Sequence, residues 1–505
     1  MQPAETPSHE RAAALKAHAA PNFSLRRRAA RAEAALILAL AIALGGFIRF
    51  FHLGVAEITA DEATSWATAS APTLAGVILA HHGRNPGTLG LHDLILHLWL
   101  LMFGDSEAAL RSLSALFGVA AIALVFFVAC ELLMLPADDG EGREADAPAA
   151  ELTAAFGAFI TAISLVMINS SREARMYPLT LALVLAQVGL FIRAVHRGGW
   201  PNFLALAAFT ALAVASNFTA AFAFAAEGAW FGWRLVANWR RGLSLDKRAW
   251  RAAFGVLAGF AMLAPFAPVV ALQLRSGVNG QWLWIAPPRL LDPIQMFESA
   301  SGVWVFILLA ALALWALLSR WRSRRHQVAF LLIWMWLPPL AQLAISYLFK
   351  PMDVTRYALS SFIAFYILAA LGIAALGDVR ARAGAAALLG FTMLAHVYHY
   401  DRKPRDMQFR EAVALATQAA PGRERIGVVG WGGIDGSALY YAPPERRPDL
   451  VHLPPNAADL ALASSAAQIR IVILPAYMSP VTLARYRALY PRLDGSFRGV
   501  EVRSK

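Results

Sequence analysis

The chain has 505 residues, 58% of them hydrophobic and 15% charged, whereas a soluble domain carries roughly 25% charged residues. The apolar residues lie in blocks of about 20, long enough for an α-helix to cross a bilayer, which excludes a water-soluble globular protein. The basic residues behind the formal charge of +12 gather between these blocks, which favours cytoplasmic loops beside anionic lipid over nucleic-acid binding. The single cysteine, Cys130, excludes an intramolecular disulfide and a cysteine-built metal site.

Residues 1–32 form a polar tail that ends in four arginines, just before the apolar run 34–51. This order predicts a cytoplasmic tail and a first membrane span. A cleaved signal peptide is the alternative, but the run is long and no small-residue cleavage site clearly follows it. The further predicted spans are 108–135, 152–169, 178–195, 203–215, 218–233, 252–272, 303–318, 328–348, 357–376 and 383–397.

The short segment 89–103 decides the topology of everything downstream. If it crosses the membrane, the basic stretches at 193–197, 234–251, 320–325 and 380–382 lie outside, against the positive-inside tendency. If it lies along the interface, all four return to the cytoplasm, and its polar residues His92, Asp93 and His97 suit a half-buried interfacial helix. We therefore predict about eleven spans, with the amino terminus inside and the carboxyl terminus outside.

This topology predicts a transmembrane domain over 33–400, whose outer loops at 52–106, 170–177, 273–300 and 350–356 are the places to seek function. Residues 401–505 have a soluble composition. Strand-like runs at 426–429, 469–474 and 498–502 alternate there with helical segments at 409–419 and 480–489. The predicted fold is an all-α polytopic membrane protein with interfacial helices in its first outer loop and a small outer-face α/β domain.

Two adjacent acids, Asp61 and Glu62, follow the first span and open a helical segment, 63–70. The spacing fits a capping box, in which Thr59 caps the helix and Glu62 folds back on it. Asp61 is then left without a structural task. A carboxylate beside a membrane-embedded cavity is costly unless hydrogen-bonded or used, so Asp61 is a candidate general base. The alternative for Asp61 is a first-turn acid that the helix dipole favours.

Two further clusters lie in outer loops. Arg172, Arg175 and Tyr177 stand at a helix end, and Lys350, Arg356 and Tyr357 lie between two late spans. The basic residues either snorkel to phospholipid headgroups or form a shared anion site, with Arg84 of the first loop as a weaker member. Arginine supplies a forked donor of fixed charge, and a phosphate leaving group gains negative charge as its bond to a sugar breaks.

The remaining candidates are aromatic and imidazole side chains of the outer loops. His92, Asp93 and His97 are candidates for acceptor binding, and with His81 and His82 they include potential metal ligands, but the spacing matches no recognised metal site. The long loop 273–300 is expected to order over the site when substrate binds. Its aromatic candidates are Trp282 and Trp284.

In this order, the residues resemble the GT-C glycosyltransferases of the dolichyl-phosphate-mannose protein mannosyltransferase and aminoarabinose transferase type. The resemblance covers roughly the first three quarters of the chain. The ordered set that carries it is Asp61 and Glu62, then His97-Leu98-Trp99 running into Phe103-Gly104-Asp105-Ser106 and Arg111, then residues 171–177, then Arg356 and Tyr357.

In that family the first-loop acid is assigned as the catalytic base, which implies Asp61 here, and outer-loop arginines and tyrosines are implicated in holding the lipid phosphate. The family usually has a Pro-Pro-aromatic stretch, sometimes preceded by Lys, directly ahead of His-Leu-Trp. Here residues 89–93 stand in that place, and Arg84 substitutes for the Lys only with a shifted register.

The combined prediction is an inverting glycosyltransferase in the inner membrane of a bacterium. It moves a monosaccharide from a polyprenyl-phosphate carrier to a lipid, glycan or protein acceptor at the periplasmic face, with no cofactor beyond the donor and no metal supported by the sequence. One rival is a transporter or flippase for sugar-lipids, which predicts charges and broken helices at mid-membrane. The other is an inactive scaffold that binds lipid phosphate.

Overall fold

The computed structural model describes residues 8–84, 87–135, 147–242, 247–277, 285–401, 407–430, 435–454 and 469–505. All eleven predicted apolar runs are helical for most of their length. The helices are α1 (Ser8–Phe50), α5 (Glu107–Leu133), α6 (Ala147–Ile163), α7 (Leu165–Ser171), α8 (Tyr177–Arg197), α9 (Trp200–Ser216), α10 (Ala220–Trp239), α11 (Lys247–Ala261), α12 (Ala267–Gly277), α14 (Val303–Leu348), α15 (Leu359–Ala374) and α16 (Val379–Asp401).

The described helices contain five that are long and apolar enough to cross a membrane, or six if α6 and α7, bent by 60° at their junction, count as one broken span. The prediction of about eleven is larger for two reasons. It counts the shorter apolar helices α9 and α15, and also α10 and α16, which are not among these candidate spans. It also divides α14, whose 46 residues contain two predicted runs on either side of a non-helical residue, Arg324. The polytopic, helical architecture itself is confirmed.

Helix α15 forms the centre of the bundle because it is apolar on all sides. Nearly every residue from Leu359 to Ile373 is buried, and the helix packs between α14 and α6. At Gly372 the backbones come so close that a Cβ atom would lie 2.0 Å from the carbonyl oxygen of Leu312 in α14. A glycine at this position therefore permits close contact between α15 and α14.

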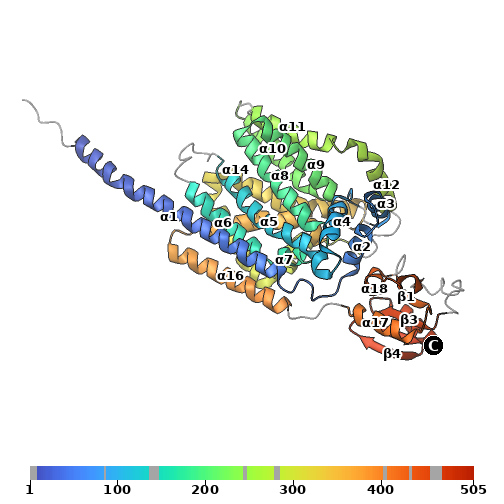
Figure 1. Cartoon of the computed structure of the whole chain (residues 1–505). Coiled ribbons are helices and arrows are strands. Elements are labelled where there is room, and N and C mark those ends of the chain that lie inside the picture. The colour runs from blue at the N-terminus through green and yellow to red at the C-terminus, as the bar shows by residue number, and fades with distance from the viewer. Residues whose placement is uncertain are drawn as a thin grey trace, which may run out of the picture.

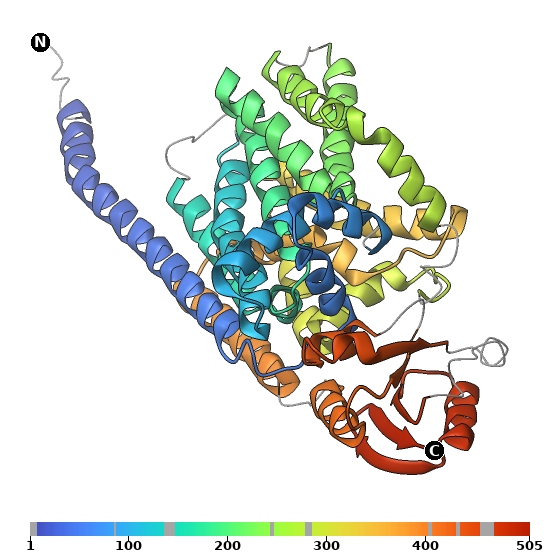
Figure 2. The same ribbon diagram turned by 45° about the vertical axis from the view of Figure 1, so that its right-hand side comes forward.

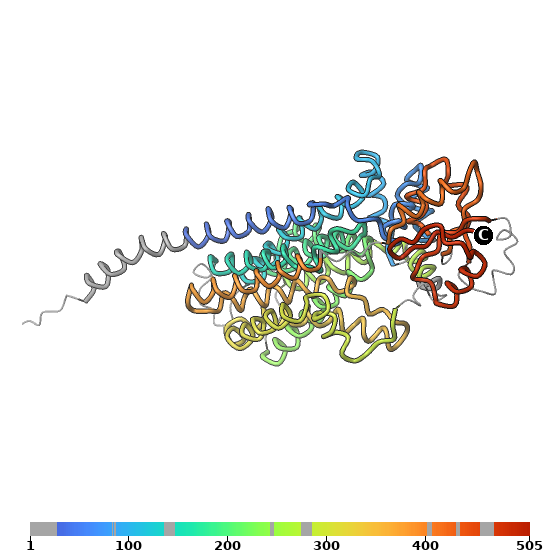
Figure 3. Tube along the Cα trace, turned by 90° about the horizontal axis from the view of Figure 1, so that it is seen from below, coloured from blue at the N-terminus to red at the C-terminus, as the bar shows by residue number. Residues whose placement is uncertain are grey.

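The first outer loop forms three short helices, α2 (Ala60–Ala69), α3 (Leu74–Arg84) and α4 (Leu91–Phe103), at one end of the bundle (Figure 1). The polar residues of α4 face inward, whereas Leu98, Leu101, Met102 and Phe103 are exposed. This apolar outer face agrees with the predicted interfacial helix. The C-terminal domain lies at the same end of the bundle, beside these helices, and α1 begins toward the opposite end (Figures 2 and 3).

The C-terminal domain is a five-stranded sheet covered on both faces. The strands are β1 (Ile426–Val429), β2 (Leu450–Leu453), β3 (Ile471–Pro475), β4 (Arg492–Phe497) and β5 (Val500–Ser504), in the order β2-β1-β3-β5-β4. Strand β1 is parallel to β2 and β3, and β5 is antiparallel to β3 and β4. Helices α17 (Phe409–Ala419) and α18 (Gly436–Tyr441) cover one face and α20 (Pro480–Leu489) the other. The predicted small α/β domain is therefore present.

Candidate active site

The Glu62 carboxylate is buried and hydrogen-bonded to the protein around it. The Glu62 N–H donates to Thr59 Oγ1 (3.3 Å) and the Thr59 N–H donates to Glu62 Oε2 (2.9 Å), which completes the predicted capping box. The carboxylate also accepts from Arg111 Nε and Nη2 (2.7 and 2.9 Å) and from the Ala174 N–H (3.0 Å). Its exposed fraction is 1%. This geometry favours the structural interpretation of Glu62 over a catalytic one.

Asp61, the preceding residue, is open to solvent and paired with an arginine from a distant segment. Arg356, in the 3-10 turn η2 (Thr355–Tyr357), donates from Nη1 to Asp61 Oδ2 at 2.7 Å. Arg175 donates from Nη1 to the Asp61 carbonyl oxygen (3.0 Å) and to Ser65 Oγ (3.1 Å). Three segments more than 100 residues apart in sequence thus meet at the start of α2.

The two arginines set the charge state of Asp61. Burial alone raises the pKa of a carboxyl group, but the positive charges of Arg175 and Arg356 outweigh burial and lower the pKa of Asp61 below its ordinary value. Asp61 is therefore a carboxylate at neutral pH. It can accept a proton only weakly while Arg356 remains bound to it.

Aromatic rings complete the surroundings of Arg356. Its guanidinium lies 5.3 Å from the ring centroid of Tyr177, and the rings of Tyr177 and Tyr357 are 6.2 Å apart. Burial raises the pKa of Tyr357 above its ordinary value, and the nearby Tyr177 adds to this effect. The Tyr357 hydroxyl therefore stays protonated. Both tyrosines therefore border the guanidinium, one of them through its π face.

Two cavities open beside this cluster. One, of about 390 Å³, is lined by Arg356 and Tyr177, and the other, of about 570 Å³, lies between the first outer loop and the C-terminal domain. Glu173, Asn169 and Tyr400 line both. Burial, together with the negative charge of Glu62, raises the pKa of Glu173 to about 7. Glu173 therefore places a carboxyl group that gains or loses its proton near neutral pH at the boundary of the two cavities.

The other predicted phosphate-binding residues are less central. Arg172 lines the larger cavity and donates from Nη2 to the Phe51 carbonyl oxygen (3.2 Å). Lys350 lies half-buried after α14 and is not among the residues that line the two cavities. Arg84 is exposed and donates from Nη1 to the Ala67 carbonyl oxygen (3.0 Å), which ties α3 to α2.

The imidazole candidates are placed between helices and do not line the two cavities. Asp93 accepts from His81 Nδ1 (2.7 Å) and lies 3.3 Å from His92 Nδ1. Despite burial, the hydrogen bonds from His81 and His92 hold the pKa of Asp93 well below its usual range. His97 Nδ1 is 2.8 Å from the Ala69 carbonyl oxygen. These residues join α2, α3 and α4, and no group of three or more His, Cys, Asp or Glu in the described ranges is arranged to hold a metal ion.

Trp282 and Trp284 lie outside the described residues. Sequence reasoning assigned no role to Glu173, although it lies inside the Ser171 to Tyr177 motif and is an acid between two arginines. It also missed Asp435 and Tyr477 of the C-terminal domain, which line the larger cavity and have no local sequence signal.

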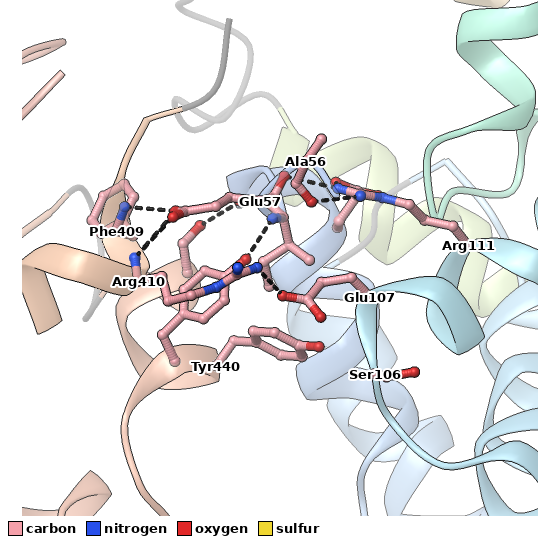
Figure 4. Close-up of polar contacts among 12 residues, drawn as sticks. Ala56, Glu57, Ser106, Glu107, Arg111, Phe409, Arg410 and Tyr440 are labelled. Carbon is pink, nitrogen blue, oxygen red and sulfur yellow. Dashed lines mark hydrogen bonds and ion pairs between the residues drawn. The ribbon is translucent and has the colours of Figure 1, made fainter. Parts of the chain in front are cut away.

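The loop that leads into α2 is held from two sides (Figure 4). From α5, Arg111 donates to the carbonyl oxygens of Ala56 (2.7 Å) and Glu57 (2.8 Å). From the C-terminal domain, the N–H groups of Phe409 (2.6 Å) and Arg410 (3.2 Å) donate to the Glu57 carboxylate. Glu57 therefore caps α17, whose own preceding residue makes no side-chain cap.

Two more contacts fasten the C-terminal domain to this loop. Arg410 Nη2 donates to Glu107 Oε1 at 2.6 Å, at the start of α5. The Ile58 N–H donates to the Tyr441 hydroxyl at 2.9 Å. Asp61 is thus presented by a loop whose backbone is fixed by both the membrane domain and the C-terminal domain.

No family model matches the sequence, and no curated relative matches it. Solved structures do match. ArnT from Cupriavidus metallidurans in the apo state has a TM-score of 0.60 at 12% identity, with 94% of this chain and 98% of that chain covered. The same protein bound to undecaprenyl phosphate gives 0.55 at 11% identity, with 93% and 97% covered.

Two other enzymes share the architecture. The Archaeoglobus fulgidus oligosaccharyltransferase has a TM-score of 0.54 at 13% identity, with 91% of this chain and 72% of that chain covered. The arabinofuranosyltransferase AftD from Mycobacteria has a TM-score of 0.55 at 14% identity, with 94% and 40% covered. All three proteins are GT-C glycosyltransferases. The chain therefore has the GT-C fold, as the sequence resemblance predicted.

Proposed function

We propose that this chain is an inverting glycosyltransferase that moves one sugar from a polyprenyl-phosphate carrier to an acceptor hydroxyl at the outer face of a bacterial inner membrane. The observation that carries the proposal is the meeting of Asp61, Arg175 and Arg356, of which Arg356 lines the smaller of two adjoining cavities. A carboxylate next to fixed guanidinium groups suits a reaction in which a hydroxyl loses a proton while a phosphate departs. The GT-C fold of the chain supports the same class of reaction.

The chemistry is a single displacement at the anomeric carbon. The acceptor oxygen attacks from the face opposite the phosphate while Asp61 takes its proton. The bond between the anomeric carbon and the phosphate oxygen breaks, and its electron pair leaves with polyprenyl phosphate. Arg356 stabilises the charge on this leaving group, and the Tyr177 hydroxyl is a further donor at the wall of the smaller cavity. Arg175 is buried behind Asp61 and adds positive charge from there.

Arg356 links donor binding to the strength of the base. A phosphate that enters the smaller cavity competes with Asp61 for the guanidinium, because both anions need its Nη1 face. As Arg356 turns to the phosphate, the pKa of Asp61 rises, and Asp61 becomes a better proton acceptor only when the donor is present. Asp61 therefore remains a weak base while no donor is bound.

The orientation in the membrane rests on the distribution of arginines. At the end of α5 away from the site, Arg197 pairs with Glu131 (3.1 Å) and Arg324 donates to the Leu133 carbonyl oxygen (2.8 Å). Two of the basic stretches in the sequence therefore gather at the end opposite Asp61. With the positive-inside tendency, this arrangement supports a cytoplasmic amino terminus and a periplasmic C-terminal domain.

The test replaces two neighbouring carboxylates in cells that otherwise lack the protein. With Asp61→Asn, mass spectrometry of envelope lipids and glycans should show loss of the sugar-modified species, while protein level and thermal stability remain those of the wild type. Glu62→Gln is the matched control: it leaves the buried Arg111 charge without its partner and should cost about 3–5 kcal/mol of stability. Full modification in the Asp61→Asn strain would discard the assignment.

The two rival functions predict different results with purified protein. A transporter moves the carrier lipid across proteoliposome membranes without forming a glycosidic bond. An inactive scaffold binds undecaprenyl phosphate, but the envelope species are identical with and without the protein. Either result contradicts the proposed transferase.

A further inference from the structure

The membrane domain and the C-terminal domain jointly enclose the larger cavity. Its walls come from the first outer loop, from the turn between α7 and α8, and from the C-terminal domain through Phe409, Asp435, Ser437 and Tyr477. Its volume of about 570 Å³ lies within the roughly 300–1,000 Å³ of small-molecule sites. It has room for a head group and is too small for a folded partner.

The two cavities carry different charges, and each is therefore suited to a different substrate. In the larger cavity Glu62 and Arg111 neutralise each other, which leaves the carboxyl groups of Glu57, Glu173 and Asp435 against one arginine. Such a lining offers a phosphate little net positive charge and accepts hydrogen bonds from hydroxyl groups. The smaller cavity has the opposite character, because Arg356 lines it together with hydroxyl and amide donors.

One pair in the C-terminal domain is arranged for a ligand with hydroxyl groups. Tyr477 is 44% exposed and donates from its hydroxyl to Asp435 Oδ2 at 2.6 Å. Asp435 Oδ1 accepts from the Ser437 N–H (2.9 Å), which fixes the carboxylate at the start of α18. The remaining lone pairs of Asp435 and Tyr477 can accept hydrogen bonds from sugar hydroxyl groups, and the apolar residues Met407 and Phe409 line the same cavity.

We propose that the larger cavity is the acceptor site and that the C-terminal domain, through Asp435 and Tyr477, selects a neutral, hydroxyl-rich head group of carbohydrate type. This inference rests on the proposed transferase function and names its acceptor class. Glu173, at the boundary with the donor cavity, marks where the acceptor hydroxyl passes toward Asp61.

The test measures binding of defined sugars to the full-length protein in phosphatidylcholine nanodiscs by saturation-transfer NMR. The probes are methyl α-D-glucopyranoside, methyl α-D-mannopyranoside and, as the anionic comparison, glucose-6-phosphate. A neutral glycoside should bind saturably and more tightly than the phosphate. Tyr477→Phe and Asp435→Asn should each weaken it by about 3- to 10-fold, the loss of one hydrogen bond. Asp435→Asn retains the oxygen that caps α18.

Tyr486→Phe is the matched control, because it removes a tyrosine hydroxyl on the opposite face of the same sheet, where that group donates to the Pro454 carbonyl oxygen. It should bind glycoside as the wild type does. No saturable binding of either neutral glycoside, tighter binding of the phosphate, or equal binding by Tyr477→Phe, Asp435→Asn and Tyr486→Phe overturns the inference.

A separate measurement keeps this inference apart from the proposed function. Native mass spectrometry with undecaprenyl phosphate should show wild-type lipid binding in Tyr477→Phe and Asp435→Asn, as expected for two separate sites. If the lipid binds no variant while the glycosides still bind through Tyr477, the polyprenyl-phosphate function fails and the sugar site stands. If the lipid binds but the glycosides do not, the acceptor assignment fails alone.

Discussion

Two neighbouring acids show how burial separates structural from chemical roles at the scale of single residues. Successive residues of a helix point about 100° apart, so Asp61 and Glu62 face different surroundings. Glu62 turns inward to Arg111 and is 1% exposed, whereas the side chain of Asp61 is 47% exposed at the cluster with Arg356. A side chain with free lone pairs can meet a substrate, and one whose acceptors are all used cannot.

The first prediction at this scale concerns Arg356→Gln. This change removes the charge that lies 2.7 Å from Asp61 Oδ2 and borders the donor cavity. Since Arg356 helps to hold the pKa of Asp61 down, the acidic limb of the pH–rate profile for kcat/KM should move to higher pH. Undecaprenyl phosphate should also bind about tenfold more weakly or worse, because a charge-assisted hydrogen bond is lost.

Arg84→Gln is the control for this measurement. Arg84 undergoes the same loss of charge in a different loop, the first outer loop, where it contacts only the Ala67 carbonyl oxygen among the contacts that the structure describes for it. Its pH–rate profile and lipid affinity should remain those of the wild type. An unchanged acidic limb in Arg356→Gln, or the same loss in both variants, would contradict the role given to Arg356.

At the scale of elements, the sequence pattern predicts most of the fold. The spacing of apolar residues along the chain indicates whether a helix or strand is buried on one face or on all of them. The helices α17 and α20 and the strand β1 have the limits that the sequence predicted. Strands β2 and β4 were missed. Strand β2 has only four residues and is flanked by proline and other residues that disfavour strands. Strand β4 is an edge strand that contains Arg, Asp and Gly. Neither strand therefore shows an alternating apolar pattern.

The site was predictable only in part, because its geometry depends on long-range contacts. Local motifs pointed to Asp61, Arg175 and Arg356 one at a time, since each lies in a short polar segment between apolar runs. Their meeting depends on how the tertiary fold brings together segments 114 and 295 residues apart in sequence. No periodicity encodes this, and the same limit explains why Asp435 of the C-terminal domain was missed.

A prediction at the element scale concerns the contact of α15 with α14. Gly372→Ala places a methyl group where the nearest atom is a backbone carbonyl oxygen, 2.0 Å away, which cannot rotate aside. The helices must separate, and the free energy of unfolding should fall by about 1–3 kcal/mol. Thermal unfolding of detergent-solubilised protein, followed by tryptophan fluorescence, measures the loss.

The matched control is Gly384→Ala in α16. A Cβ atom added there has no neighbour within 4 Å, so the change should be neutral or raise stability by about 0.5–1 kcal/mol, the cost of glycine within a helix. Equal midpoints for the two variants would mean that α14 and α15 do not approach at Gly372 as described.

At the scale of the whole molecule, the C-terminal domain braces the loop that presents Asp61. The Glu57 carboxylate lies at the first turn of α17, and Tyr441 of α18 binds the backbone one residue later, at Ile58. Residues more than 350 positions apart thus fix one loop. Loosening this contact moves Asp61 relative to Arg356 without touching either residue, so docking of the domain and catalysis are expected to change together.

Docking should depend on pH through Glu57. Burial, reinforced by the nearby Glu411, raises the pKa of Glu57 from an ordinary 4.5 to about 7, although the backbone N–H groups of Arg410 and Phe409 favour the carboxylate. A group whose pKa rises on docking contributes stability that is complete below pH 4.5 and is lost as the pH rises through about 7. Docking should therefore weaken progressively as the pH rises from 4.5 to about 7, and it should change little above that pH.

Glu57→Gln supplies the reference, because its amide stays neutral at every pH and keeps one oxygen for the Phe409 N–H. Hydrogen–deuterium exchange of peptides from α17, expressed as the ratio of wild type to variant at the same pH, removes the intrinsic pH dependence of exchange. The ratio should rise between pH 4.5 and about pH 7, because the cost of burying ionised Glu57 develops over this range. A ratio that falls would mean that the helix dipole and the two N–H donors stabilise the carboxylate more than burial destabilises it, so that Glu57 acts as an ordinary charged cap.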